Sequence, residues 1–318
     1  MSRPPSLALP ARTRAGLLET ERGRFAALDC TPPAGVPHVG TVLLVPGFIG
    51  SKEDFLPLLR PLSEAGYRAV AVDGRGQHET PGPADEEAYA PHELAADVRA
   101  QTAALEEEGT GGAQGAGVGE PGISLHLLGH SLGALTARSA VLAAATSCPW
   151  ASLTLMGSGP AAVRPEQQKR VRLLVEWLPT LGKEALWQEM QKAPRSEQAA
   201  DEVPADVAEF LHRRWLNTVP EQLTATSRRL LTEPDRVAEL AAVPIPKLVL
   251  SGSTDYAWPV PWQDDMATRL AADRAVIEGA DHSPNVEQPT ATARALIAFW
   301  QRVEARRHTP GTRSRLSA

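Results

Sequence analysis

The 318-residue sequence contains only two cysteines, Cys30 and Cys148, too few for a disulfide framework. We interpret both as reduced packing residues, which favours a cytoplasmic location. The N-terminal residues lack the apolar stretch of a signal peptide, and no hydrophobic run reaches membrane-spanning length. We therefore expect a soluble protein with no membrane partner.

The chain also lacks an excess of positive charge. Its formal net charge is −6 at pH 7, so neither nucleic acid nor an anionic membrane surface is expected as a partner. Residues 307–318 are basic and could be a nucleic-acid arm, but we interpret them as a flexible terminus, like residues 1–13. The sequence leaves the oligomeric state open.

Motifs for a cofactor or a metal ion are also missing. Residues 109–122 are rich in glycine, which raises the possibility of a phosphate-binding loop. The segment lacks Gly-Lys-Ser/Thr and precedes a strand, whereas a phosphate-binding loop follows one. We interpret it as a flexible surface insertion and predict a protein that uses neither cofactor nor metal.

What the sequence does contain is a regular alternation of strand and helix patterns. After a hairpin over residues 17–30, short apolar runs typical of buried strands occupy residues 41–45, 67–72, 123–128, 151–156, 247–250 and 275–277. Helical patterns follow over residues 52–65, 92–107, 132–145, 262–270 and 289–306. The alternation predicts an α/β fold with a mostly parallel central sheet and helices on both faces.

Between residues 160 and 242 the alternation stops. Two amphipathic stripes indicate helices there, and no strand signal intervenes. We predict a helical cap over residues 160–242, inserted into a core that consists of residues 14–159 and 243–306. Of five tryptophans in or just beyond it, we expect at least half in the core and one or two in a pocket: Trp177, Trp187, Trp215, Trp258 and Trp262.

Residues 129–133 read Gly-His-Ser-Leu-Gly and fit the pattern G-x-S-x-G. The pattern alone is weak, because a Gly-Ser turn before a helix produces it as well. Here a buried strand precedes it and a helix follows, which is the context that a nucleophile elbow requires. Such a turn would expose the hydroxyl of Ser131 and aim the N–H of Leu132 at whatever Ser131 attacks.

A serine hydroxyl needs a base to remove its proton. Among eight histidines, His282 is the best placed, because it lies in a loop just after the strand expected at residues 275–277. His78 also follows a strand end and stays a candidate. We expect His126 to be packed in the sheet and the side chain of His130 to point away from Ser131.

A carboxylate that orients the base is expected at the end of a neighbouring strand. Asp255 follows the strand at residues 247–250 and fits this role, although it could instead cap the next helix. Asp281 is the second candidate, because side chains of adjacent residues rarely face each other. The order Ser131, Asp255, His282 is the one expected of an α/β-hydrolase.

The chain thus resembles the α/β-hydrolase superfamily over nearly all of residues 15–306, in the form that has a helical cap. The motifs that carry the resemblance stand in the correct order, and they are Gly47-Phe48, Asp73-Gly74-Arg75-Gly76, residues 129–133, Gly252-Ser253-Thr254-Asp255 and Asp281-His282-Ser283-Pro284. It departs from the usual pattern at Pro46-Gly47, where many relatives have His-Gly, and at Gln77-His78, where a glycine is usual.

The resemblance implies a role for each of these residues. Ser131 would be the nucleophile, His282 the base and Asp255 its orienting carboxylate. The backbone N–H groups of Phe48 and Leu132 would form the oxyanion hole. By the same resemblance, Asp73 and Arg75 brace the loops and take no part in the reaction.

We therefore predict a serine hydrolase that cleaves an ester-type bond of a small to medium, largely apolar substrate through an acyl-enzyme. The bond could be a carboxylester, a lactone or a thioester. The same machinery would also serve a C–C bond hydrolase, an acyltransferase or a perhydrolase. A non-catalytic member of the fold that binds a ligand is a further alternative. Dehalogenase and epoxide hydrolase chemistry would need a carboxylate at position 131.

Overall fold

A computed structural model describes residues 2–111, 123–144, 147–192 and 203–308. The surface insertion expected at residues 109–122 and the flexible tail expected at residues 307–318 fall mostly outside these ranges. Within them, no helix combines the length and the apolar composition that crossing a bilayer requires.

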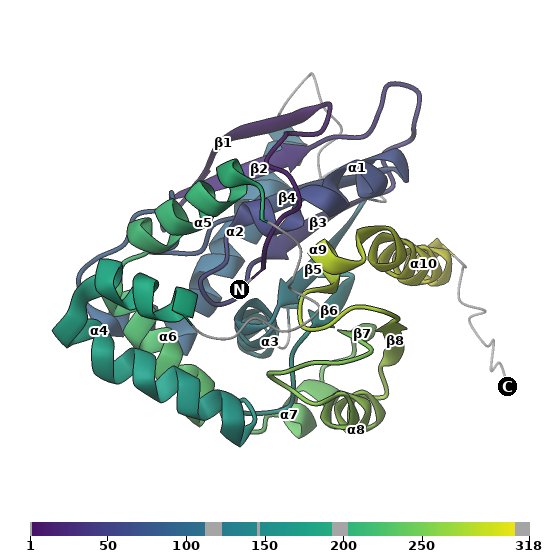
Figure 1. Cartoon of the computed structure of the whole chain (residues 1–318). Coiled ribbons are helices and arrows are strands. Elements are labelled where there is room, and N and C mark those ends of the chain that lie inside the picture. The colour runs from purple at the N-terminus through teal and green to yellow at the C-terminus, as the bar shows by residue number, and fades with distance from the viewer. Residues whose placement is uncertain (1, 112–122, 145–146, 193–202, 309–318) are drawn as a thin grey trace, which may run out of the picture.

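An eight-stranded sheet forms the centre of the molecule, in the order β1-β2-β4-β3-β5-β6-β7-β8 (Figure 1). The strands are β1 (Thr13–Thr20), β2 (Gly23–Cys30), β3 (Gly40–Val45), β4 (Tyr67–Val72), β5 (Ser124–His130), β6 (Ser152–Met156), β7 (Lys247–Gly252) and β8 (Asp273–Ile277). β2 runs antiparallel to β1 and β4, and every other pair is parallel. The predicted mostly parallel sheet is confirmed.

Helices cover both faces of the sheet because alternate residues of its central strands point to opposite sides. In β3, Leu43 and Val45 join a core shared with α2, α3 and α8, whereas Val42 and Leu44 join a second core shared with α1 and α10. These helices are α1 (Leu56–Glu64), α2 (Pro91–Gly111), α3 (Leu132–Ala144), α8 (Val260–Leu270) and α10 (Pro289–His308).

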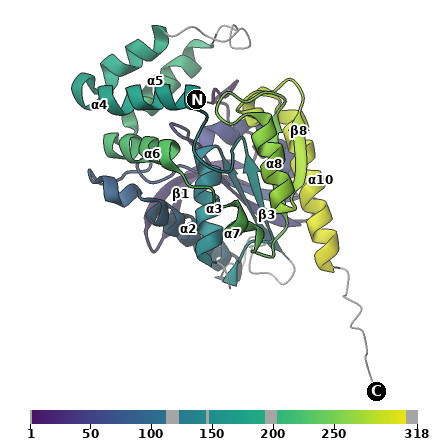
Figure 2. The ribbon, with the colours of Figure 1, turned by 90° about the horizontal axis from the view of Figure 1, so that it is seen from below.

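The helical insertion lies between β6 and β7. It consists of α4 (Pro165–Lys192), α5 (Ala205–Asn217), α6 (Pro220–Thr232) and α7 (Val237–Ala241). Figures 1 and 2 both show α4, α5 and α6 together on one side of the molecule, away from α8 and α10. The predicted insertion of helices into an α/β core is therefore present.

Some local elements differ from those expected. The helix predicted over residues 52–65 is split into the 3₁₀ helix η1 (Lys52–Phe55) and α1, since Pro57 in the first turn of α1 has no N–H to continue a helix from η1. Two short helices, η2 (Glu86–Tyr89) and α9 (Pro284–Glu287), had no clear signal. The N-terminal segment, for which the sequence predicts flexibility, has Ser2 and Pro4 buried.

A buried ionic cluster ties the insertion to the helix that follows Ser131. Glu233, just after α6, accepts hydrogen bonds from Arg138 of α3 and from Arg229 of α6, each at 2.7 Å. Arg138 also donates to the carbonyls of Pro160 (2.6 Å) and Pro234 (3.4 Å), so it contacts the segment before α4 and the segment between α6 and α7. All three charged side chains are at most 4 % exposed.

Replacing Glu233 by glutamine should therefore be costly. Glu233→Gln leaves two buried guanidinium groups without their anion, and we expect the free energy of unfolding in urea at pH 7 to fall by about 3–5 kcal/mol. Glu239→Gln is the matched control, because Glu239 pairs with Arg236 on the surface; it should cost about 0.5 kcal/mol or less. Equal losses in the two variants would contradict a role for the cluster.

Candidate active site

The turn between β5 and α3 holds Ser131 in a strained conformation. Its φ angle is 56°, in the left-handed region that residues other than glycine rarely adopt. Glycines allow the crossing: a Cβ on Gly129 would lie 2.3 Å from the carbonyl oxygen of Gly133, and a Cβ on Gly133 would lie 2.3 Å from that of Val45. The Ser131 N–H donates to the carbonyl of Met156 in β6 at 2.8 Å, which fixes the turn.

Three side chains from distant parts of the chain meet at this turn. The hydroxyl of Ser131 lies 3.0 Å from Nε2 of His282, and Nδ1 of His282 lies 3.0 Å from Oδ1 of Asp255. Each of the three residues is 6–7 % exposed. Ser131 follows β5, Asp255 follows β7 and His282 follows β8, so the carboxyl ends of three parallel strands bring them together.

Asp255 is held by more than its contact with His282. Oδ1 also accepts the N–H groups of Ala257 (2.7 Å) and Trp258 (3.0 Å), and Oδ2 accepts from the side chain of Gln263 at 3.0 Å. Burial raises the pKa of this carboxyl, but the charge and hydrogen bond of His282 and the two N–H groups outweigh it and lower the pKa below its ordinary value. An ionised Asp255 accepts a hydrogen bond from Nδ1–H of His282, so Nε2 is unprotonated and can accept a hydrogen bond from Ser131.

The other carboxylate and histidine candidates lie elsewhere. The N–H of Asp281 donates to Glu287 at 2.6 Å, and it is Asp255 that accepts the hydrogen bond from the His282 ring. The ring of His130 bonds through Nε2 to the carbonyl of His282 at 2.9 Å, so it does not serve as the base for Ser131. His78 is buried with its ring against Phe210.

His126 belongs to a separate Ser-His-Glu arrangement, which lies near the amino end of β5 and so at the opposite end of that strand from Ser131. Its Nδ1 lies 2.8 Å from Ser152 Oγ and its Nε2 lies 2.9 Å from Glu304 Oε1. Ser152 and His126 are 0 % exposed, so no substrate reaches this hydroxyl. The arrangement gives hydrogen-bond partners to buried polar atoms in the core. The two groups have similar hydrogen-bond distances, but only Ser131 is open to a cavity.

Two backbone N–H groups beside Ser131 have no acceptor among the described residues: those of Phe48 and Leu132. Phe48 follows Gly47, where a Cβ would lie 3.0 Å from Cβ of Ser131, so this loop runs directly against the serine. Leu132 is the first residue of α3, where the helix dipole favours negative charge. A developing anion on an attacked carbonyl therefore finds donors on both sides.

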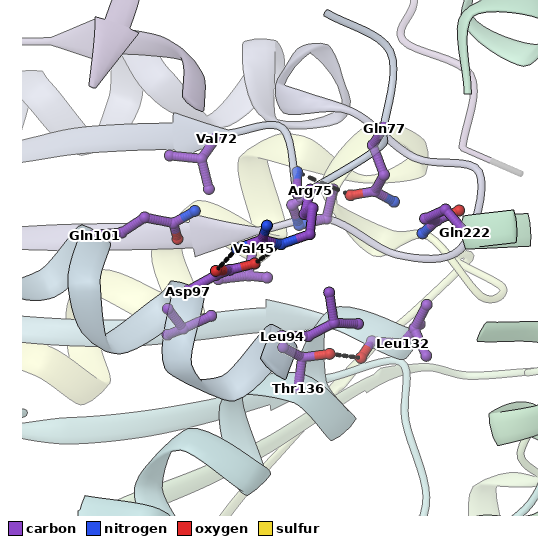
Figure 3. Close-up of a pocket in the computed structure, with 13 residues that line it drawn as sticks. Val45, Val72, Arg75, Gln77, Leu94, Asp97, Gln101, Leu132, Thr136 and Gln222 are labelled. Carbon is purple, nitrogen blue, oxygen red and sulfur yellow. Dashed lines mark hydrogen bonds and ion pairs between the residues drawn. The ribbon is translucent and has the colours of Figure 1, made fainter. Parts of the chain in front are cut away.

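A hydrogen bond from Gln77 supports the loop that contains Phe48. The side chain of Gln77 donates to the carbonyl of Gly47 at 2.8 Å, and Ile49 takes a φ of 56° in the turn that follows. Figure 3 shows Arg75 directed toward Asp97 beneath this region, with Arg75 Nε 2.7 Å from Asp97 Oδ2. Asp73 accepts from both the N–H and the ammonium of Lys52. These contacts fit the bracing roles expected for Asp73 and Arg75.

A small space lies under the elbow, in the region drawn in Figure 3. Its volume is about 30 Å³, and the side chains of Gln101 and Gln222 help to line it. The side-chain oxygens of both glutamines have no hydrogen-bond partner among the described residues. A space of this size next to two unpartnered side-chain oxygens suits a water molecule and is far too small for a substrate.

A cavity of about 600 Å³ opens over Ser131 and His282. Most of its wall is apolar and comes from α4, from the loop after β3 and from the segment after Asp255, with Phe48, Val171, Leu174, Trp177 and Trp258 among its residues. Its polar part includes Asp54 and Ser2, together with Gln167, Arg170, Glu189 and Lys192 of α4. The size and the lining suit a small to medium apolar molecule.

The tryptophans divide between core and cavity. Trp215 and Trp258 are 0 % exposed, and Trp258 also lines the cavity and stacks near His282, with ring centroids 6.0 Å apart. Trp177 is 37 % exposed and lines the cavity, whereas Trp187 lies over His212 in α5 and Trp262 is 40 % exposed. Two of the five therefore line the cavity.

One group of acidic and imidazole side chains has the composition of a metal site. The ligand atoms of Glu53, His78 and Glu79 lie within 4.8 Å of one another. The ammonium of Lys52 lies 2.9 Å from Glu53 and 2.7 Å from Glu79. A cation of the protein itself thus pairs with both carboxylates, and we interpret the group as structural.

Several residues that shape the site carry no signal in the amino-acid sequence. Gln263, inside α8, bonds to Asp255, and the ring of Tyr256 packs 4.8 Å from that of His282. Ser2 lines the cavity although it lies in the segment expected to be flexible. A signal existed only for Gln77, which directly follows the Asp-Gly-Arg-Gly motif.

Comparisons with known proteins agree with this architecture. Residues 42–295 match a sequence model described as the alpha/beta hydrolase family. The chain is similar in structure to a thermophilic esterase from Thermogutta terrifontis (TM-score 0.67, 23 % identity, covering 92 % of this chain and 99 % of that one). It is also similar to the enol-lactonase from Burkholderia xenovorans LB400 (TM-score 0.68, 17 % identity, covering 90 % of this chain and 100 % of that one). A third similar structure is a bromoperoxidase from Bacillus anthracis (TM-score 0.68, 15 % identity, covering 91 % of this chain and 100 % of that one). The predicted fold is confirmed.

The buried His130 should make stability depend on pH. Burial and the neighbouring His282 lower the pKa of His130 to about 3, whereas in an unfolded chain it is about 6.5. Between these values the unfolded state binds a proton that the folded state does not, so this contribution to stability is complete above pH 6.5 and is lost as the pH falls.

We therefore expect His130→Asn to flatten the pH dependence of unfolding. Between pH 6 and 4, wild type should lose up to about 1.4 kcal/mol per pH unit more than the variant in urea titrations. The control is His92→Asn, which changes an exposed histidine at the start of α2 and should follow wild type. If His130→Asn follows wild type as well, His130 is not held neutral by burial.

Proposed function

The chain belongs to the α/β-hydrolase family, and on this basis we propose that it is a serine hydrolase that cleaves ester-type bonds. The observation that carries the proposal is the continuous hydrogen-bonded path from Asp255 through His282 to Ser131, which opens onto an apolar cavity of about 600 Å³. A nucleophile, a base and a space for an acyl group are thus adjacent.

The reaction begins with a proton transfer. As the oxygen of Ser131 attacks the acyl carbon, its proton passes to Nε2 of His282 over the 3.0 Å contact. The imidazolium that forms is stabilised by Asp255, whose lowered pKa keeps it ionised at neutral pH. His282 then gives the proton to the leaving alcohol, and the acyl group stays on Ser131.

The negative charge on the attacked oxygen needs donors that are already in place. The N–H groups of Phe48 and Leu132 meet this need, because both flank Ser131 and neither has an acceptor among the described residues. Each such donor contributes about 3 kcal/mol to transition-state stabilisation. In the second half of the reaction, water attacks the acyl carbon as it gives a proton to His282. His282 then returns the proton to the oxygen of Ser131 as the bond to the acyl carbon breaks and the acid leaves.

The cavity determines the class of substrate. Apolar and aromatic side chains make up the larger part of its wall, so an aliphatic or aryl acyl group is favoured. The helices of the insertion cover Ser131, which suits small and medium esters better than polymers. A carboxylester, a lactone or a thioester would all fit this chemistry.

Ser131→Ala should abolish hydrolysis of p-nitrophenyl butyrate. We expect kcat to fall at least ~1000-fold, because the members of such a triad act as a unit. Ser147→Ala, an exposed serine outside the cavity, is the control and should keep wild-type activity. A fluorophosphonate probe should label wild type on Ser131 and leave the alanine variant unlabelled. Full activity of Ser131→Ala would reject the proposed nucleophile.

Asp255→Asn tests the orienting carboxylate. The amide can favour the tautomer of His282 with its proton on Nε2, which cannot accept from Ser131, so we expect kcat to fall by about 10³–10⁴-fold with the fold intact. Asp281→Asn is the matched control, since it changes the adjacent carboxylate that does not bond to the His282 ring, and it should lose less than about 5-fold. The reverse result would assign the role to Asp281.

A further inference from the structure

The first residues of the described chain reach the catalytic cavity. Ser2 is 5 % exposed and lines the cavity together with Ser131 and His282. Figures 1 and 2 show the N-terminal end of the chain between the helical insertion and the sheet. We call residues 2–7 the strap.

Two hydrogen bonds hold the inner end of the strap. The carbonyl of Ser2 accepts from Nη2 of Arg214 at 2.9 Å, and its hydroxyl lies 3.0 Å from that of Ser283, the neighbour of His282. One bond leads to α5 in the insertion and the other to the loop that carries His282. The strap therefore contacts both layers that enclose the cavity.

The arginine that holds the strap is wholly inside the protein. Arg214 is 0 % exposed, donates to Asp54 at 2.6 Å and lies over the ring of Phe210 at 5.3 Å. A buried guanidinium needs hydrogen-bond acceptors, and the Ser2 carbonyl is one of those it has. The contact between Arg214 and Ser2 is therefore part of a buried polar network.

The outer part of the strap covers an apolar surface of α5. Leu7 packs against the cluster formed by Val207, Phe210 and Leu211. The path from Ser2 to Leu7 thus runs from the catalytic cavity along the apolar side of this helix. Removing the strap would uncover the apolar surface of α5 on which Leu7 packs, a surface that suits a hydrocarbon chain.

We infer that the strap ends the substrate cavity and so limits the length of the acyl group, with Ser2 as a specificity-determining residue. The inference rests on the proposed ester hydrolysis at Ser131. In the intact protein a short or medium acyl chain fills the cavity as far as Ser2. A longer chain meets the strap, which Arg214 and Ser283 hold in place.

The test compares kcat/KM for p-nitrophenyl acetate, butyrate, octanoate and dodecanoate. A variant that lacks residues 2–7 should raise the dodecanoate-to-butyrate ratio at least ~10-fold, because the cavity is then open toward α5. Ser2→Trp should act in the opposite direction: the indole fills the end of the cavity and lowers the octanoate-to-acetate ratio of kcat/KM at least ~10-fold. If the shortened chain does not fold, Ser2→Trp decides alone.

Ser6→Trp is the matched control, because it introduces the same side chain into the same segment at an exposed position outside the cavity. Its chain-length profile should equal that of wild type. Unchanged ratios in Ser2→Trp, or equal changes in Ser2→Trp and Ser6→Trp, would overturn the inference while wild-type ester hydrolysis still supports the proposed function. A wild type that neither hydrolyses these esters nor reacts with a fluorophosphonate would overturn both.

Discussion

The interaction on which the rest depends is the pair of hydrogen bonds that His282 makes, one to Asp255 and one to Ser131. The second joins residues 151 positions apart in the chain, so it exists only when the whole sheet has formed. Each partner stands at the carboxyl end of its own parallel strand, where the pleated sheet fixes its position. Burial in a site of low dielectric strengthens both bonds and makes an unpaired partner costly.

Backbone strain and packing at the site follow from the need to hold Ser131 in contact with His282. Ser131 sits at a φ of 56° and Ile49 at the same value, and both flank the space where an acyl oxygen would lie. Neighbouring contacts hold this strain, such as the Met156 carbonyl on the N–H of Ser131 and Gln77 on the carbonyl of Gly47. The ionic cluster around Glu233 then keeps the insertion seated over the cavity.

Much of this could be predicted from the sequence, because the signals are local. The apolar runs located the strands, and the glycines at 129 and 133 located the elbow; parallel strand ends converge, so Asp255 and His282 could be paired with Ser131. Gln263 and Ser2 could not be found in this way, since their partners are set by tertiary packing alone. Residues 1–13 are predicted to be flexible because proline and arginine are common there. In the structure, the carbonyl of Ser2 is one of the acceptors of buried Arg214.

The most direct test of the central claim is the position of the proton on the His282 ring. In protein labelled with ¹⁵N-histidine, with His282→Gln to assign the signal, ¹⁵N NMR at neutral pH distinguishes the two tautomers. The bond from Nδ1 to Asp255 predicts a protonated Nδ1 and an unprotonated Nε2 that accepts from Ser131. A ring protonated on Nε2 alone would contradict the account.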